Sequence, residues 1–479
     1  ALLKLVNEVR SDVRILANDL LMHVQPLRPC LLPVKNMGST LTAKGQIRRI
    51  SNALDNDEAL IIFPAGEVSR FSPRRVRDTR WQKGFLSIAE KSRAPILPIH
   101  INGKNSLTFY TASMLFKPLS TAMLVGEMFK QQENQISFTV GSIIPWQAYG
   151  KIPLPAKERV KLLKKHLYRI GKGRKPLFDT ENAVARPERR SDLKQALIEA
   201  ELLGTTPDGK QIYLYSGEES SPILREIGRL REITFRAVAE GTGNRRDMDR
   251  FDTIYQHLIL WDGEDLEIVG AYRFTDSAVT IKGHGLNGLY TNSLFNFDKK
   301  HCSFLDQGLE LGRSFVQQRY WGKRSLDYLW YGIGAYLARN PKHRYLFGPV
   351  SVSGSMPRGG KDLLIYFYKL YFGSEEMPGC SRNPFHFDRA IEELASQFSG
   401  SNRKKDFKQL KTMLKNMDTT VPPLYKQYSE LCTSGGVKFI DFNIDPDFND
   451  CVDGLVVVDI QLLKPKKRKR YINTSFLAE

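Results

Sequence analysis

The chain has 479 residues, of which 41% are hydrophobic and 26% are charged, so it is typical of a globular protein of two or three domains rather than of a disordered chain. Lys and Arg outnumber Asp and Glu by 71 to 52, and the net charge of +19 indicates an anionic partner, which can be nucleic acid, an anionic lipid surface or an acidic carrier protein. The five cysteines form no CxxC pair, and no apolar run reaches about 18 residues, which disfavours a disulfide framework, a zinc site and a membrane-spanning helix.

The first quarter of the chain alternates helix and strand signals. Apolar residues at helical spacing predict a helix over residues 2–9, and a short strand is expected at residues 13–17. An amphipathic helix is expected over residues 42–53. The next strand runs into residues 61–70, where a Pro/Gly turn is followed by a carboxylate, a hydroxyl and a guanidinium, groups that suit a ligand site at a strand end.

Helix and strand signals continue to alternate up to residue 170. A basic loop is expected at residues 71–83, a helix at 84–91, strands at 94–103 and 136–144, and a basic helix at 157–170. This alternation predicts an α/β domain with a largely parallel sheet covered by helices. A surface turn with a solvated Arg is the plainer interpretation of residues 61–70.

Residues 61–70 resemble the phosphate-binding block of the glycerolipid acyltransferases, the family that includes lysophosphatidic acid acyltransferase. Phe63, Pro64 and Gly66 match the family's Phe-Pro-Glu-Gly, whereas Ala65 stands in place of the Glu. The family's next apolar block matches residues 95–99, followed by a Gly. The resemblance implies that Gly66, Glu67, Ser69 and Arg70 bind substrate, with Arg70 gripping a phosphate or carboxylate.

The same family uses a His, four residues and an Asp as its general base upstream of the first helix, and the chain contains no such match there. We expect this motif to lie upstream of Ala1. A degenerate, non-catalytic domain is the alternative.

Residues 176–195 are expected to link this domain, residues 1–175, to a second one at residues 196–463 that precedes a basic tail at 464–479. The second domain is also predicted to be α/β, with mixed sheet signals. Its elements are expected at residues 223–238 (helix), 257–261, 267–274 and 309–313 (strands), 325–339 (helix), 345–351 (strand), 386–416 (basic helix) and 439–459 (strands).

The order of polar and apolar residues in the second domain resembles the ornithine N-acyltransferases of the GNAT superfamily, which are similar to acyl-homoserine lactone synthases. The resemblance extends from about residue 223 to 460 and includes the stretches 270–273, 310–313 and 345–348. It implies a site for the amine substrate that is lined by six residues: Arg231, Asp249, Asp252, Arg273, Glu310 and Arg313. A structural ion-pair network is the alternative for this set.

The chemistry of amine acylation gives Glu310 and Arg313 particular interest. A base must accept the proton of the ammonium group, and Glu310, in an apolar strand, is a candidate for that role. Arg313 can pair with Glu310 or grip an anionic group. We therefore predict that these two residues are catalytic.

The expected acyl donor is a thioester, and neither a bound cofactor nor a metal is expected. The pyrophosphate loop of the GNAT superfamily is incomplete at residues 319–323, which favours acyl carrier protein over acyl-CoA. Carrier proteins are acidic, so the positive charge of the chain would attract them. The basic tail at 464–479 suggests contact with anionic membrane lipids, and it lacks the interleaved aromatic residues that favour nucleic acid.

These observations predict a bacterial, bifunctional acyltransferase of aminolipid synthesis, peripheral on the inner face of the cytoplasmic membrane. Its second domain would N-acylate ornithine or a related amino acid from (3-hydroxy)acyl carrier protein, and its first domain would O-acylate the lyso-lipid. Two alternatives stay open: a lysophosphatidate-type acyltransferase with a regulatory second half, and a non-catalytic basic membrane-binding protein.

Overall fold

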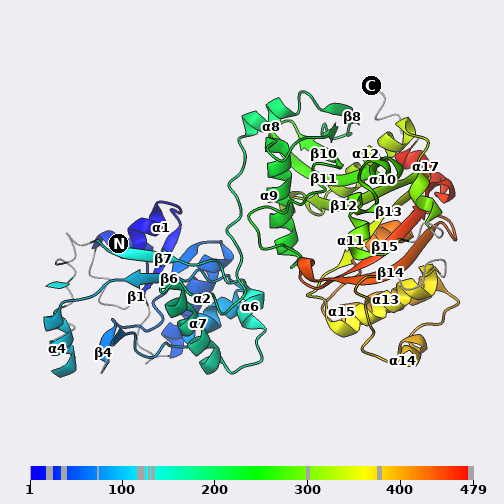
Figure 1. Ribbon diagram of the computed structural model, residues 1–479. Helices are drawn as coiled ribbons and strands as arrows, with labels where there is room; N and C mark the ends of the chain where they lie inside the picture. The colour runs from blue at the N-terminus through cyan, green and yellow to red at the C-terminus, as the bar shows by residue number, and fades with distance from the viewer. Residues whose placement is uncertain are drawn as a thin grey trace. The chain divides into compact units, whose positions relative to one another are not determined.

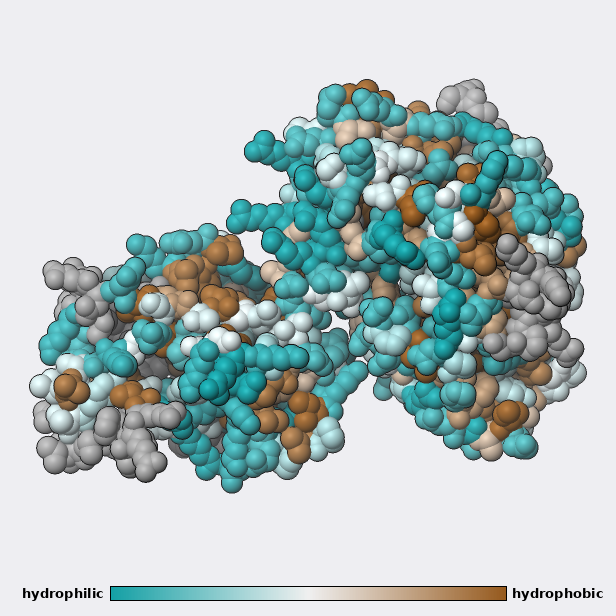
Figure 2. Space-filling model, in the orientation of Figure 1, coloured by the Kyte–Doolittle hydropathy of each residue, from teal (hydrophilic) through white to brown (hydrophobic). Residues whose placement is uncertain are grey.

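The computed structural model describes residues 2–17, 25–33, 40–72, 75–115, 123, 126–127, 130, 135–297, 302–374 and 380–472. The chain forms two compact units, Ala1–Ala183 and Val184–Glu479 (Figure 1). Both units combine helices with sheets, so the predicted α/β class is confirmed. The visible face of each unit is mainly hydrophilic, with hydrophobic side chains in scattered groups (Figure 2). None of the described helices is long and apolar enough to cross a membrane.

The first unit contains a parallel sheet in the order β2-β1-β3, formed by β1 (Val13–Ala17), β2 (Leu31–Pro33) and β3 (Ala59–Ile61). Two further strand pairs are antiparallel, which differs from the largely parallel sheet that the sequence predicts. They join β4 (Arg70–Ser72) to β5 (Arg75–Arg77) and β6 (Ile99–Asn102) to β7 (Ser137–Val140). The described helices of this unit are α1 (Leu2–Asn7), α2 (Thr40–Asp55), α3 (Gly84–Lys91), α4 (Leu107–Leu115), α6 (Trp146–Gly150) and α7 (Ala156–Ile170).

The core of the first unit lies between α3 and α7. Leu86 of α3 and Leu163 of α7 pack with Trp81, Ile144 and Tyr149, and all five are buried. These apolar positions recur at helical spacing on one face of each helix, so burial of that face stabilises both.

The second unit is built on one eight-stranded sheet in the order β14-β15-β13-β12-β11-β10-β9-β8 (Figure 1). Only the pair β12/β13 is parallel, and the other neighbouring pairs are antiparallel. The strands are β8 (Glu201–Thr205), β9 (Gln211–Tyr215), β10 (Gln256–Asp262), β11 (Glu267–Asp276), β12 (Gly308–Val316), β13 (Tyr345–Val352), β14 (Val437–Asp445) and β15 (Cys451–Asp459).

Helices cover both faces of this sheet. Along β10, Leu258 and Leu260 pack with the α12 cluster, whereas Ile259 and Trp261 pack with the α9 cluster. Because successive strand residues point to opposite faces, α9 and α12 lie on opposite sides. The helices are α8 (Arg190–Ala196), α9 (Pro222–Ala237), α10 (Ser277–His284), α11 (Thr291–Leu294), α12 (Ser325–Arg339), α13 (Arg358–Phe372), α14 (Ile391–Ser396), α15 (Arg403–Lys415), α16 (Pro423–Ser429) and α17 (Pro465–Tyr471).

The strands β12 and β13 diverge near the middle of the sheet. They pair only over Gly308–Glu310 and Tyr345–Phe347, after which β13 continues along β15 to Val352. On its other side β12 stays paired with β11, but the register shifts by one residue near Arg313, whose φ of 50° lies in the left-handed region. Backbone outliers of this kind occur at functional sites.

Candidate active site

A deeply buried ion pair of the second unit joins α9 to the loop before β10. The N-terminus of α9 is capped by the Ser221 hydroxyl, and the helix carries Arg231 on its buried face. Nη1 and Nη2 of Arg231 each donate to one carboxylate oxygen of Asp252, both at 2.8 Å, and the two side chains are 1% and 2% exposed. This two-pronged geometry fixes the orientation of the Arg231 guanidinium relative to the Asp252 carboxylate.

Asp252 is shared with a second arginine. Arg273 on β11 donates to it from Nη1 at 3.0 Å, and the backbone N–H of Asp249 donates at 2.8 Å. Burial alone would raise the pKa of Asp252, but the two guanidinium groups hold it well below its usual range. The neighbouring His257 is fully buried, which lowers its pKa to about 4, so its imidazole is neutral at pH 7.

Arg273 links this network to a group of aromatic rings. Its Nη1 donates to Asp249 at 2.5 Å, and its guanidinium lies 5.2 Å and 5.5 Å from the ring centroids of Tyr255 and Tyr290. The side chain is 1% exposed, yet its Nη2 has no hydrogen-bond partner among the described residues. A buried guanidinium N–H without an acceptor is costly, so a ligand oxygen would be stabilised here.

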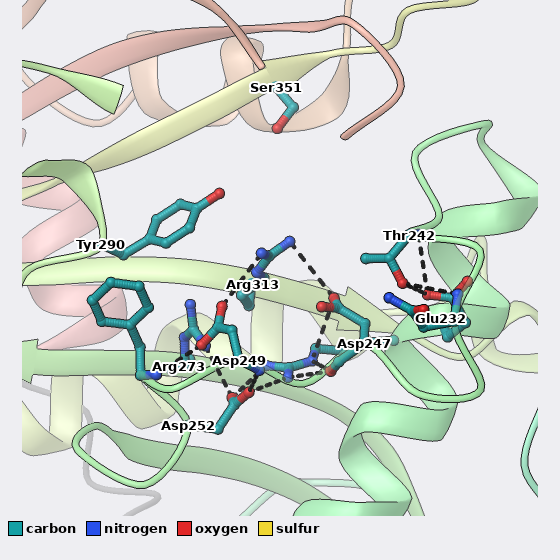
Figure 3. Close-up of polar contacts among 12 residues, drawn as sticks. Glu232, Thr242, Asp247, Asp249, Asp252, Arg273, Tyr290, Arg313 and Ser351 are labelled. Carbon is teal, nitrogen blue, oxygen red and sulfur yellow. Dashed lines mark hydrogen bonds and ion pairs between the residues drawn. The ribbon is translucent and has the colours of Figure 1, made fainter. Parts of the chain in front are cut away.

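Arg313 lies at the centre of the site, on the diverging part of β12 (Figure 3). It forms ion pairs with Asp249 at 3.4 Å and Asp247 at 3.6 Å. Its guanidinium is stacked between Tyr290, at 5.0 Å from the ring centroid, and Phe448, at 4.2 Å. The side chain is 10% exposed, and both its Nε and Oδ2 of Asp247 have no hydrogen-bond partner among the described residues.

Glu310 precedes Arg313 on the same strand but has separate partners. One carboxylate oxygen accepts from the Tyr255 hydroxyl, and the other accepts from the Thr291 N–H at 2.6 Å. The residue is 1% exposed, and burial raises the pKa of its carboxyl group. The Tyr255 oxygen itself accepts from the Tyr290 N–H at 2.8 Å. Glu310 therefore holds Tyr255 and the chain at Tyr290 in place.

Three acidic residues that the sequence analysis does not single out interact with Arg313: Glu240, Asp445 and Asp453. Burial raises the pKa of Asp453 on β15 to about 6, and the Ser351 hydroxyl donates to it at 2.7 Å. Burial and the proximity of Asp453 raise the pKa of Glu240 to about 8, while Arg313 acts to lower it. Asp445, at the end of β14, also has a raised pKa because of burial.

The turn after α9 holds Glu240 in this group. Glu232, which is fully buried, accepts from the Thr242 hydroxyl at 2.7 Å and the Gly243 N–H at 2.9 Å (Figure 3). The Ala239 carbonyl accepts from Asn449 at 2.8 Å, and φ of Ala239 is 61°. The Glu240 carboxylate is half-buried and, within the described part of the chain, accepts no hydrogen bond from a side chain or backbone N–H. It is thus a positioned carboxylate without a protein donor.

In the first unit, the candidate residues follow β3. Gly66 has φ of 69°, a conformation that favours glycine. The Ser69 hydroxyl donates to Asp78 at 2.5 Å, and the other Asp78 oxygen accepts from the Trp81 indole at 3.0 Å. Glu67 is exposed, and the Arg70 side chain lies outside the described residues.

The structure brings together Arg231, Asp249, Asp252, Arg273 and Arg313. The Glu310 carboxylate instead accepts hydrogen bonds from Tyr255 and Thr291. Asp453 carries a signal that the sequence analysis did not use, because a lone Asp interrupts an apolar strand. Glu240 has no comparable signal, since it lies in a polar turn. Within the described ranges, no three His, Cys, Asp or Glu side chains are placed to hold a metal ion.

Two family models match the chain, one in each unit. Residues 230–331 match an acetyltransferase (GNAT) domain, and residues 4–171 match an acyltransferase. The GNAT match includes Arg231, Arg273, Glu310 and Arg313. The predicted pairing of two acyltransferase domains is confirmed, and the protein is an acyltransferase.

Curated relatives agree with this division. A glycine N(alpha)-acyltransferase of Bacteroides thetaiotaomicron is 33% identical over 304 residues, which cover 61% of this chain and 90% of that protein. A lyso-glycine lipid O-acyltransferase of the same organism is 34% identical over 153 residues, 31% of this chain, and the chain spans 56% of its length. An L-ornithine N(alpha)-acyltransferase of Brucella abortus is 34% identical over 146 residues, which cover 27% of this chain and 50% of that protein.

Among solved structures, a CoA-dependent acyl-homoserine lactone synthase is 14% identical, with a TM-score of 0.22, and the similarity covers 30% of this chain and 67% of the synthase. A similarity of this size carries no weight for substrate or donor.

Proposed function

The chain belongs to the family of bacterial amino-acid N-acyltransferases that includes glycine N(alpha)-acyltransferase, and on this basis we propose that its second unit transfers a fatty acyl group from a thioester to the amino group of a small amino acid. The acceptor we favour is glycine. The glycine enzyme is matched over 90% of its length, whereas the ornithine enzyme is matched over 50%.

The observation that carries this proposal is that guanidinium groups with buried N–H groups lacking an acceptor and carboxyl groups with raised pKa values lie together around Arg313. The guanidinium groups of Arg273 and Arg313 are placed to receive the carboxylate of a free amino acid, since each has a buried N–H without an acceptor. Glu240 and Asp453 are close enough to Arg313 to interact with it electrostatically, and they suit the ammonium group. Opposite charges set side by side match a zwitterion better than they match a lipid phosphate.

The reaction needs a carboxylate whose pKa is raised toward neutral pH, because the ammonium group of the amino acid must lose a proton before it attacks. In this proposal the Glu240 carboxylate accepts a proton from the ammonium group, and the free amine then attacks the thioester carbonyl. The C–N bond forms, the C–S bond breaks, and a second proton passes from nitrogen to the departing thiolate. The products are the amide, a free thiol and protonated Glu240, which returns its proton to water.

Glu310 has a different role in this scheme. Both of its oxygens accept hydrogen bonds from protein donors, and the Tyr255 oxygen accepts from the Tyr290 N–H, so Glu310 acts through these residues in this proposal. Glu310 is therefore a positioning residue. It fixes Tyr255 and Tyr290, whose rings flank Arg273, and the Tyr290 ring also stacks on Arg313.

The first unit is proposed to O-acylate the product of the second. This assignment rests on the acyltransferase match over residues 4–171 and on the relative that acts on lyso-glycine lipid. Gly66, Glu67, Ser69 and Arg70 would bind the acceptor or donor in this unit. We propose acyl carrier protein as the donor and a peripheral position on the inner face of a bacterial cytoplasmic membrane.

The test is lipid profiling of bacteria that produce this chain. The proposal predicts new N-acylated glycine that incorporates labelled glycine, and its loss in an Arg313→Ala variant of equal abundance. Labelled ornithine in the new lipid, without labelled glycine, would overturn the choice of acceptor. A new phospholipid without an amide would overturn the N-acyltransferase proposal.

A further inference from the structure

The basic segment near the C-terminus is a packed helix rather than a solvated tail over Pro465–Tyr471. Tyr471 is 5% exposed, and its ring packs against Trp330 and Tyr331 of α12. Its hydroxyl donates to Asp327 at 2.9 Å, and Arg470 pairs with the same carboxylate. The helix α17 is therefore fixed on α12 (Figure 1).

This anchoring presents a group of cations on one surface. The inner side of α17 is fixed through Tyr471, and Lys466 and Lys469 are exposed. The loop that leads into α12 adds further exposed cations, of which Arg324 lies 3.6 Å from Asp327 and so belongs to the same surface. We call this surface the α17 patch and define it by five residues: Lys323, Arg324, Lys466, Lys469 and Arg470.

The loop that carries Lys323 and Arg324 of the α17 patch follows the end of β12 that diverges from β13. The loop from β12 to α12 begins after Val316, whose carbonyl accepts from the Trp321 indole at 2.7 Å. Arg313 lies three residues before Val316 on the same strand, a distance of about 10 Å at strand spacing. The patch also lies on the α12 side of the sheet, whereas Arg231 and Glu240 come from α9 and the turn after it.

We propose that the α17 patch is the docking surface for an acidic acyl carrier protein, which delivers its thioester to Arg313 from the diverging end of β12. The inference rests on the proposed N-acyltransferase function and adds the place where the donor protein binds. An acidic partner complements the cations of the patch, and such complementarity governs the rate and register of association.

A membrane surface fits the patch less well. An interfacial helix buries an apolar face in the bilayer. The apolar residue of α17 that could serve in this way is Tyr471, and it is already buried against α12. The remaining side chains of the helix are charged apart from Pro465, so binding to lipid would depend on charge alone.

The experiment uses the full chain with Lys466→Glu and Lys469→Glu together. The control carries Lys404→Glu and Lys408→Glu, two exposed cations of the helix α15 in the same unit. Each protein is assayed for N-acylation with acyl-loaded acyl carrier protein and with the N-acetylcysteamine thioester of the same acyl chain, which has no carrier. Binding of fluorescent acyl carrier protein is measured separately by anisotropy.

We expect the α17 variant to raise the KM for acyl carrier protein and the Kd of the labelled carrier by at least about tenfold. The rate with the small thioester should stay unchanged, and the α15 control should behave as the parent protein does. Unchanged carrier binding overturns the proposal, and so does an equal loss of rate with both donors. Lost binding to phosphatidylglycerol vesicles with unchanged carrier binding assigns the patch to the membrane instead.

The anisotropy measurement also separates this inference from the proposed function. If the parent protein acylates no amino acid from either donor but binds the carrier through Lys466 and Lys469, the docking surface stands and the N-acyltransferase proposal fails. If it acylates glycine without binding the carrier through these residues, the reverse holds.

Discussion

Arg231 and Asp252 form a two-pronged ion pair, with both N–O distances at 2.8 Å and with side chains that are 1% and 2% exposed. The pair joins α9 to the loop that carries Asp247 and Asp249. It therefore holds the site residues of this loop in place. Its loss should lower the stability of the second unit rather than act directly on the reaction.

Asp252→Asn should destabilise the second unit by about 3–5 kcal/mol, because Arg231 and Arg273 would both lose their shared buried charge. The stabilisation by Asp252 is present above the carboxyl pKa of the unfolded chain and declines as the pH falls toward the lowered folded pKa. Chemical denaturation at pH 7 and pH 3 measures both effects. Equal stability of the variant and the parent at pH 7 would show that the pair is dispensable.

Glu240→Gln should lower kcat with saturating glycine by about 10²–10⁴-fold, a loss typical of a removed general base. In the parent protein kcat/KM should rise with pH, reach half of its upper limit near pH 8 and level off above that pH, because Glu240 must be ionised to accept a proton. The variant should lack this limb. A variant that keeps both the rate and the pH profile would exclude Glu240 as proton acceptor.

The same substitution should act on stability in the opposite direction. The folded pKa of Glu240 lies above its unfolded value of about 4.3, so ionisation weakens the fold as the pH rises from that value through about 8. Glu240→Gln removes this half-buried charge and should raise Tm relative to the parent at pH 9. A lower Tm at pH 9 would show that the carboxylate is stabilised by the fold.

Arg313→Lys should raise the KM for glycine by at least about tenfold. Lysine keeps the charge but loses the planar group that stacks between Tyr290 and Phe448 and pairs with both Asp247 and Asp249. Steady-state kinetics with the small thioester isolate the acceptor. An unchanged KM would show that Arg313 does not bind the carboxylate of the amino acid.

Asp78→Asn provides a matched test in the first unit. Asp78 accepts from both the Ser69 hydroxyl and the Trp81 indole, so the amide should loosen the turn after β3. O-acylation of lyso-lipid by a form of the protein that has this activity should fall, while the N-acylation rate should remain that of the parent. A loss of N-acylation would mean that the second unit depends on this turn.

Local pattern was enough to predict the elements with strong periodicity. The helices expected at 84–91 and 325–339 have those bounds in α3 and α12, because each carries an uninterrupted apolar face. The sequence analysis did not assign α13, although that helix has a buried face just as α12 does. The paired strands β4 and β5 lie where a basic loop was expected. Their shortness and their arginine content hid the strand pattern in the sequence.

In the candidate site, the sequence indicates several of the charged residues but not which residues they pair with. Charged residues within apolar strands, such as Arg273 and Glu310, are visible in the sequence because burial of charge needs a partner. The identity of each partner depends on the register of the strands, which a one-residue bulge between β11 and β12 alters near Arg313. For this reason Glu310 pairs with Tyr255 rather than with Arg313, and Glu240 joins the site from a turn without distinctive pattern.

The most direct test of the central claim is an assay of the purified protein with acyl-loaded acyl carrier protein and with ¹⁵N-glycine and ornithine in equal amounts. Mass spectrometry identifies the products. The account predicts ¹⁵N-labelled N-acylglycine in excess over N-acylornithine, with one free thiol released per amide formed. Thiol release without any amide, or N-acylornithine as the main product, would contradict it.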